Sequence, residues 1–221
     1  MLKQRIKYLF LAAALVVTQI AVSQKSDLGI WSAYFGNQQI KNKWLLQSDF
    51  QYRLNQFADQ KSQLLLRAGI GYNLTGNNHN ILMGLAFVDS RQETEGARII
   101  EKRIYQQFLY KKKYNQIFTT HRVRLEERFF PNEFGLRSRY FFAVQLPFTK
   151  NQLNKRGIYA SSFNELFIDV RNKKFDRNRM YGGLGYVLSN VIRLETGFLI
   201  QSYKNNTRGQ FQLSIHNNLS L

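Results

Sequence analysis

The side chains best suited to chemistry in this chain are charged residues at every second position, opposite apolar ones. In the stretch 121–129, positions 122, 124, 126 and 128 are all charged, whereas Val123, Leu125 and Phe129 have the other parity. Two later stretches repeat this alternation with arginine and glutamate. The polar set consists of Arg122, Arg124, Glu126, Arg128, Arg137, Arg139, Arg193 and Glu195.

Charges that alternate in this way on neighbouring strands can form cross-strand arginine–glutamate pairs. Inside a narrow barrel they would have one of two roles. They would fill the lumen as a self-satisfying ionic ladder, or they would line it as a selective surface for a small anionic solute. We favour the ladder, because a barrel of about ten strands has little free lumen.

Nucleophilic catalysis has one candidate pair, Ser214 and His216, which share a face of the last stretch. Outer-membrane lipid hydrolases use such pairs, but the sequence places no evident orienting carboxylate beside this one. His79 and His121 are too scattered to make a metal site with His216, and there is no cysteine. We therefore predict no catalytic residue, no metal site, no cofactor and no enzymatic activity.

The elements that must position these side chains are β-strands. Between Lys43 and Leu54, for example, one face is aromatic and apolar and the other is polar or charged, with a period of two. Similar stretches recur to the last residue, and none of them predicts a long helix. The expected strands are 28–36, 43–54, 63–74, 81–90, 99–114, 116–129, 136–148, 158–170, 179–188, 191–203 and 210–221.

A single all-β domain follows: a transmembrane, up-and-down antiparallel β-barrel. Most expected strands are long enough to cross a bilayer at a tilt, and they outnumber those of a soluble eight-stranded barrel. Aromatic residues near the strand ends suit interfacial girdles. These are Trp31, Tyr34, Trp44, Tyr72, Tyr114, Phe129, Phe148, Tyr186 and Tyr203.

The number of strands conflicts with a general rule. Bacterial single-chain barrels have an even number, so we expect ten or twelve strands instead of the eleven stretches counted. If the last strand ends in the periplasm, the connections 91–98 and 171–178 face outward as the longer loops, and the first stretch points the wrong way.

The N-terminus predicts export. Lys3, Arg5 and Lys7 precede an apolar run over 8–17 and the small-x-small sequence Ala21-Val22-Ser23. This is the pattern of a cleaved signal peptide over residues 1–23, with the barrel domain over 24–221. The expected location is the bacterial outer membrane, and the barrel-assembly machinery is the expected partner during insertion.

The chain has a formal net charge of +18 and a pI near 10.2. Its basic residues are spread along all stretches, and no recognition helix or RNA-binding motif accompanies them, so we exclude nucleic acid as a partner. Outer-membrane lipids with anionic headgroups, and a small anionic solute in a basic lumen, fit the charge better.

Four segments carry a resemblance to a known family: 121–129, Arg137-Ser138-Arg139-Tyr140, 175–179 and Gly183-Leu184-Gly185-Tyr186. In order and over nearly the whole mature chain they resemble an uncharacterised family of bacterial outer-membrane barrels, a domain of unknown function frequent in Bacteroidota. The resemblance implies the fold and the location, and it implies no activity.

The predicted function is thus that of an outer-membrane barrel, structural or a narrow channel, with an arginine- and glutamate-lined lumen. Two alternatives stay open. A lipid-modifying enzyme would need Ser214 and His216 within hydrogen-bonding reach beside an acidic or amide partner. A soluble periplasmic ligand-binding barrel would remain in the soluble fraction without detergent.

Overall fold

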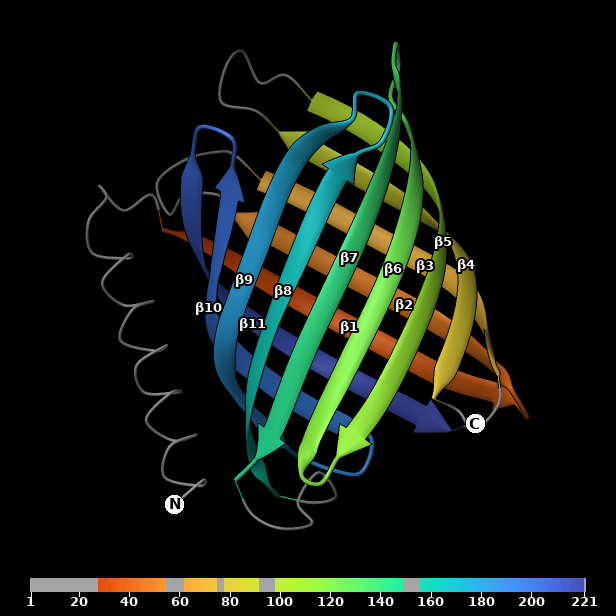
Figure 1. The fold of residues 1–221 in the computed structure, drawn as a ribbon, viewed down its shortest axis with the longest axis vertical. Helices are drawn as coiled ribbons and strands as arrows, with labels where there is room; N and C mark the ends of the chain where they lie inside the picture. The colour runs from red at the N-terminus through yellow and green to blue at the C-terminus, as the bar shows by residue number, and fades with distance from the viewer. Residues whose placement is uncertain (1–27, 55–61, 75–77, 92–97, 149–155, 221) are drawn as a thin grey trace.

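The computed structural model describes residues 28–54, 62–74, 78–91, 98–148 and 156–220, and every regular element within these ranges is a β-strand (Figure 1). No described helix is long and apolar enough to cross a membrane. The predicted signal peptide, 1–23, lies outside the described residues. The strands are β1 (Gly29–Lys41), β2 (Trp44–Leu54), β3 (Ser62–Asn73), β4 (His79–Arg91), β5 (Arg98–Tyr114), β6 (Ile117–Phe129), β7 (Phe134–Pro147), β8 (Ile158–Asp169), β9 (Lys174–Val187), β10 (Ile192–Tyr203) and β11 (Thr207–Ser220).

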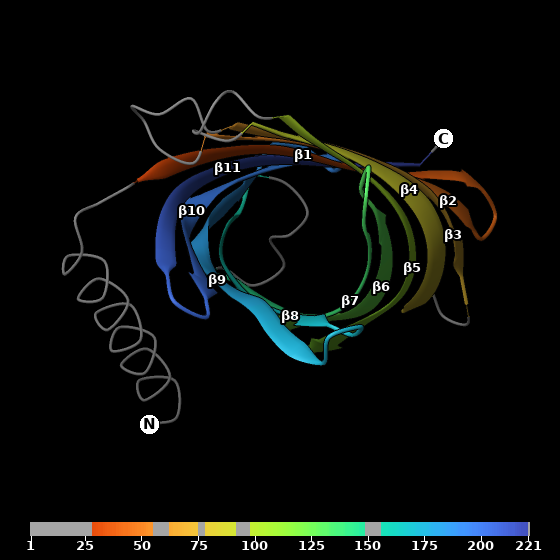
Figure 2. The same cartoon turned by 90° about the horizontal axis from the view of Figure 1, so that it is seen from above.

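The strands form one closed barrel, which confirms the predicted fold class (Figure 2). Each strand pairs antiparallel with its sequence neighbours, and β1 closes the ring by pairing parallel with β11, from Gly29 opposite Gln210 to Gln39 opposite Ser220. The expected count of ten or twelve strands is therefore wrong, because all eleven stretches are strands. A parallel closing pair removes the conflict over the direction of the first strand.

Tight turns join several strands. The β1–β2 and β5–β6 hairpins turn at Asn42 and Asn115, whose φ angles of 48° and 54° are conformations that asparagine tolerates better than most residues. The β8–β9 connection is also short, because β9 begins at Lys174. The long loop expected over 171–178 is therefore wrong, because five of its eight residues, 174–178, belong to β9.

The two faces of the wall have opposite character. Outward-facing residues are apolar and exposed, with Met83 at 60% and Leu85 at 63%. Inward-facing residues are buried and mostly polar, with Arg124 at 2% and Glu126 at 1%. Most of the nine aromatic residues expected in girdles are on the outer face, but Trp31 is buried inside and Tyr203 lines the interior. Polar groups thus occupy the place where a water-soluble protein has its apolar core.

The interior also holds two small apolar clusters. Trp31, Ala33, Tyr181 and Leu199 form one cluster, and Leu82, Ala86 and Tyr105 form the other. Glycines in the wall make room for their tyrosines. A Cβ atom on Gly84 would lie 2.6 Å from the ring of Tyr105, so only glycine permits this packing.

Candidate functional site

An ionic network crosses the middle of the lumen, centred on the carboxylate of Glu126. This residue of β6 accepts hydrogen bonds from Arg137, with Nε 3.0 Å away, and from Arg139, both on β7. The guanidinium groups of Arg124 and Arg103 approach the same carboxylate to 3.7 and 3.8 Å. Strand alternation explains the cluster, because Glu126 and Arg137 are register partners and both point inward.

A second carboxylate, Glu165 of β8, extends the network toward the other side of the barrel. Arg122 and Arg139 each place a nitrogen 2.7 Å from its Oε1, and Arg179 lies 3.8 Å from its Oε2. Arg139 thus connects the two carboxylates. Each carboxylate faces several guanidinium groups, a charge-assisted arrangement that fixes side-chain positions as well as supplying attraction.

The structure brings together six of the eight residues predicted to line the lumen. Glu126 is the centre of the network, and four arginines contact Glu126, Glu165 or both: Arg122, Arg124, Arg137 and Arg139. The sixth residue, Arg128, bonds to Glu101 one layer away. Arg193 and Glu195 also belong to the lumen, but they lie toward its other end. Sequence analysis missed further members of the network: Arg53, Arg67, Glu101, Arg103, Glu165, Arg177 and Arg179. The sequence could have identified them, because they occupy the alternate positions of their strands that face inward.

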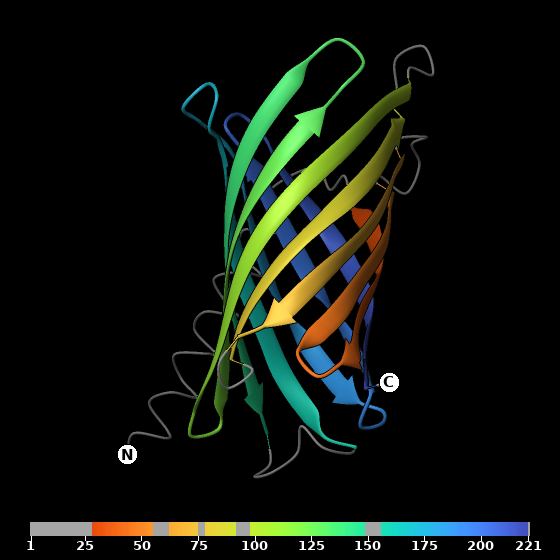
Figure 3. The same ribbon diagram turned by 90° about the vertical axis from the view of Figure 1, so that its right-hand side faces the viewer.

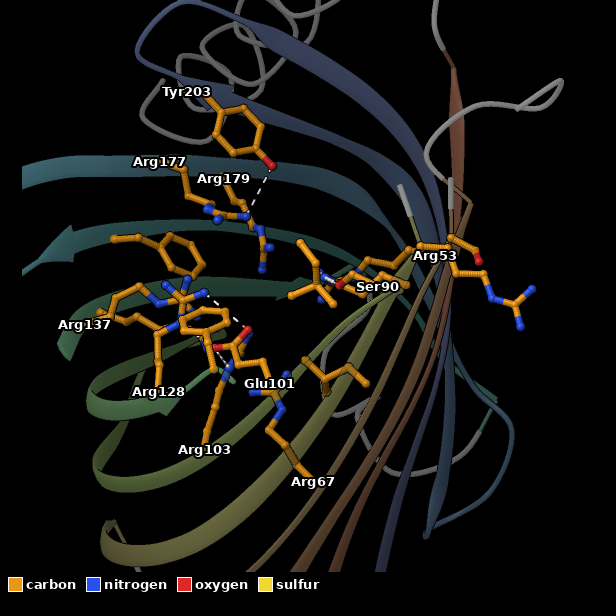
Figure 4. Close-up of a pocket in the computed structure, with 18 of the residues that line it drawn as sticks. Arg53, Arg67, Ser90, Glu101, Arg103, Arg128, Arg137, Arg177, Arg179 and Tyr203 are labelled. Atoms are coloured by element: carbon orange, nitrogen blue, oxygen red, sulfur yellow. Dashed lines mark hydrogen bonds and ion pairs between the residues drawn. The ribbon is translucent and has the colours of Figure 1, made fainter. Parts of the chain in front are cut away.

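Above the network lies a cavity of about 500 Å³, at the end of the barrel where β2, β4 and β6 end and β3 and β5 begin (Figure 4). Ten arginines and one carboxylate, that of Glu101, line it. We call it the arginine cavity. The arginines are Arg53, Arg67, Arg91, Arg103, Arg128, Arg137, Arg139, Arg177, Arg179 and Arg208.

Neutral groups hold several of these guanidinium groups in place. Arg53 donates to Gln63 at 2.8 Å and stacks on Trp31, with its Cζ atom 3.8 Å from the ring centroid. Arg177 donates to the hydroxyl of Tyr203 at 3.2 Å, its Cζ lies 4.9 Å from that ring, and its Nε also pairs with Asp176 at 3.1 Å. Aromatic stacking and amide bonds orient a guanidinium without neutralising its charge.

A family model described as "Protein of unknown function (DUF2490)" matches residues 28–212. The chain belongs to the DUF2490 family. The predicted membership in a barrel family of unknown function is thereby confirmed. No curated protein and no solved structure matches the chain. The matched region extends from the residue before β1 into β11, so the network and the arginine cavity both lie within the DUF2490 domain.

The serine–histidine pair, Ser214 and His216, follows the matched region in sequence and lies at the other end of the lumen. Ser214 Oγ is 3.2 Å from Nε2 of His216, and Glu195, which sequence analysis assigned to the polar set but not to this pair, lies 3.7 Å from the same nitrogen. A triad needs the carboxylate on the second ring nitrogen, so that the histidine can relay a proton from the serine. The pair also faces inward with Ser214 fully buried, and this arrangement does not assemble an activated nucleophile.

The remaining histidines lie on the outer face. His79 stacks on Tyr110 at a centroid distance of 4.7 Å, and Nδ1 of His121 lies 2.9 Å from the hydroxyl of Tyr140. Within the described ranges, no three His, Asp or Glu side chains group closely enough to hold a metal ion. The most numerous charged groups around the cavity are guanidinium groups.

Proposed function

We propose that this DUF2490 protein is a β-barrel of the bacterial outer membrane whose lumen is closed at mid-height by the arginine–glutamate network. In this role the barrel is a membrane-embedded scaffold with a closed lumen instead of an open diffusion pore. Export by the signal peptide 1–23, insertion by the barrel-assembly machinery and contact with anionic lipid headgroups are parts of the same proposal.

One observation carries the membrane location: the barrel has a charged interior and an exposed apolar exterior. Large apolar side chains with more than a third of their surface exposed occur on nearly all strands, including Ile70, Leu184 and Leu213. Soluble monomers rarely expose apolar patches larger than a few hundred Å². In a bilayer, lipid acyl chains would cover this apolar surface and keep it from water. Each strand has eleven to seventeen residues and is long enough to span the acyl-chain region.

The closed lumen is supported by the packing of its middle layer. Arg124 and Glu126 of β6, Phe167 of β8 and Leu199 of β10 point inward, and each has at most 2% of its surface exposed. Side chains so thoroughly covered leave no continuous water path between them. The excess of arginine supports a second candidate, a narrow anion-selective channel, if the network rearranges under a field.

Membrane fractionation and planar-bilayer recording together test the proposal. We expect the protein to remain in the outer-membrane fraction, to migrate in a heat-modifiable way, and to give no stable conductance steps. The double variant Arg124→Ala/Arg139→Ala removes two side chains of the middle layer and is expected to conduct, provided that its heat-modifiability shows a folded barrel.

Three outcomes would overturn parts of this proposal. Recovery in the soluble fraction without detergent would support a periplasmic ligand-binding barrel. Stable anion-selective steps of the unmodified protein would support the narrow channel. Hydrolysis of phospholipid that Ser214→Ala abolishes would support the lipid-modifying enzyme.

A further inference from the structure

We infer that the arginine cavity is a binding site for a compact polyanion, a sugar-sized molecule that carries several phosphate or sulfate groups. The inference rests on the proposed function only for the side on which the cavity opens. The cavity lies at the end of the barrel opposite the end of β11, so it faces outward if the last strand ends in the periplasm.

The first argument is the balance of charge around the cavity. Its ten arginines have only five carboxylates within 4 Å among the described residues: Asp49, Glu101, Glu126, Glu165 and Asp176. The connections 55–61 and 92–97 hold three more carboxylates, and arginines outnumber the total even if all three are added. Buried cations in excess repel one another strongly, so a bound anion would lower the free energy of this layer.

The second argument is that some guanidinium groups are buried without a carboxylate. Arg53 has 7% of its surface exposed, bonds only to glutamines among the described residues, and leaves its Nε atom without a hydrogen-bond partner. Arg67 also has an unpartnered Nε beside its ion pair with Asp49. A buried donor without an acceptor is costly, and oxyanions are the acceptors that arginine binds best.

The third argument is the placement of the arginines around the lumen (Figure 4). Arg53, Arg103, Arg137 and Arg179 come from β2, β5, β7 and β9, so guanidinium groups reach the cavity from several sides of the barrel. One inorganic anion would meet only a few of them. A ligand with anionic groups around its perimeter would meet many, and about 500 Å³ suits a molecule of this size.

Isothermal titration calorimetry of the full-length barrel in a neutral detergent tests this inference. The probes are inositol hexakisphosphate, sucrose octasulfate and inorganic phosphate at physiological ionic strength. We expect one molecule of a polyanion to bind per barrel, and inorganic phosphate to bind at least about a hundredfold more weakly. Preference for the phosphorylated or the sulfated probe identifies the source of the natural ligand.

A matched pair of variants separates a built site from general charge attraction. Arg53→Gln/Arg177→Gln removes two cavity charges, that of Arg53, which bonds to glutamines, and that of Arg177, which is paired with Asp176. We expect at least about tenfold weaker binding. Arg193→Gln/Lys113→Gln removes two charges at the opposite end of the barrel and should leave the affinity unchanged. The polyanion should also raise the unfolding temperature of the unmodified barrel more than that of the cavity variant.

No polyanion binding, or equal weakening by the two double variants, would overturn the inference. Because binding is measured in detergent, its failure leaves the membrane location and the closed lumen untouched. A soluble barrel that still binds the polyanion would instead overturn the proposed function and retain this site.

Discussion

Buried polar groups have different partners at the two ends of the lumen. At the cavity end, ten arginines surround one lining carboxylate and an open volume of about 500 Å³. At the other end, Glu195 accepts hydrogen bonds from the neutral groups of Tyr159, at 2.8 Å, and Gln145, at 2.9 Å. The mid-height network around Glu126 separates these two regions.

The difference is between polar groups that are satisfied by neighbouring side chains and polar groups that need a bound ligand to satisfy them. At the far end, neutral donors satisfy the Glu195 carboxylate, so these side chains stabilise the barrel without a ligand. The cavity end has a surplus of donors and of positive charge. The same barrel wall therefore encloses a packed polar core at one end and a ligand-binding cavity at the other. Variants at each level of the lumen can test this difference.

The largest expected effect is at the boundary between the two ends. Glu126→Gln removes the carboxylate that faces Arg103, Arg137 and Arg139, and leaves buried cations without compensation. We expect a loss of about 3–5 kcal/mol in the free energy of unfolding. Urea unfolding in detergent micelles, followed by tryptophan fluorescence, measures it.

The control for this variant is the next residue on the opposite face. Glu127 points outward and accepts one long hydrogen bond from Gln106, at 3.3 Å. Glu127→Gln should change the stability by less than about 1 kcal/mol. Similar losses for the two variants would refute the central role of Glu126.

The wall of the far end provides the next test. A Cβ atom on Gly185 would lie 2.1 Å from the ring of Tyr159, whereas one on Gly182 would meet nothing within 4 Å. Gly185→Val should therefore cost about 1–3 kcal/mol through overpacking. Gly182→Val, on the outer face, should be close to neutral. The same urea titration compares them, and equal effects would show that Tyr159 is not held against the wall.

A smaller effect is expected from the far-end carboxylate. Glu195→Gln keeps an amide oxygen that Tyr159 and Gln145 can still bond, so we expect a loss of about 1 kcal/mol. The comparison with Glu126→Gln is decisive in the unfolding assay. Equal losses would mean that the two ends of the lumen do not differ as we describe.

The smallest effect concerns the turn after β8, at the rim of the cavity end. The backbone amide of Asn172 donates to Asp169 Oδ1 at 3.0 Å, and this bond lowers the pKa of the Asp169 carboxyl below its usual value. A depressed pKa stabilises the folded state above the pKa of the unfolded chain, about 3.9, and the stabilisation is lost as the pH falls through the folded value.

Asp169→Ala should therefore cost about 0.5 kcal/mol at neutral pH, a value kept low because the turn is solvent-exposed. The difference from the unmodified protein should shrink below about pH 4, as the carboxyl takes up a proton. Unfolding curves at the two pH values measure it. A difference that persists in acid would assign the effect to the backbone of the turn.

Much of the fold could be predicted from alternation alone. All eleven stretches are strands in the structure, and two of the charged residues at alternate positions, Arg124 and Glu126, are buried in the interior. The error in strand number came from applying an even-number rule over the direct count. Alternation assigns a side chain to a face, but it does not determine whether the closing pair is parallel.

The site could be predicted only in part, because its members come from strands far apart in sequence. Arg53 and Arg179 approach the same ring, that of Trp31, only once the barrel has closed. Likewise, Glu195 meets His216 through the register of β10 and β11, which no local pattern specifies. Such neighbours depend on strand pairing, whereas parity depends on local sequence.

The parallel pairing of β1 with β11 has a topological consequence. Both strands start at the cavity end and finish at the opposite end, so Gly29 and Ser220 lie at opposite ends of the barrel (Figure 3). In a barrel with an even number of strands, the first strand begins and the last strand ends at the same end. If this barrel spans a bilayer, the polypeptide just before β1 and that just after β11 emerge in different compartments, so epitope tags fused at these two points would be accessible from opposite faces of the membrane.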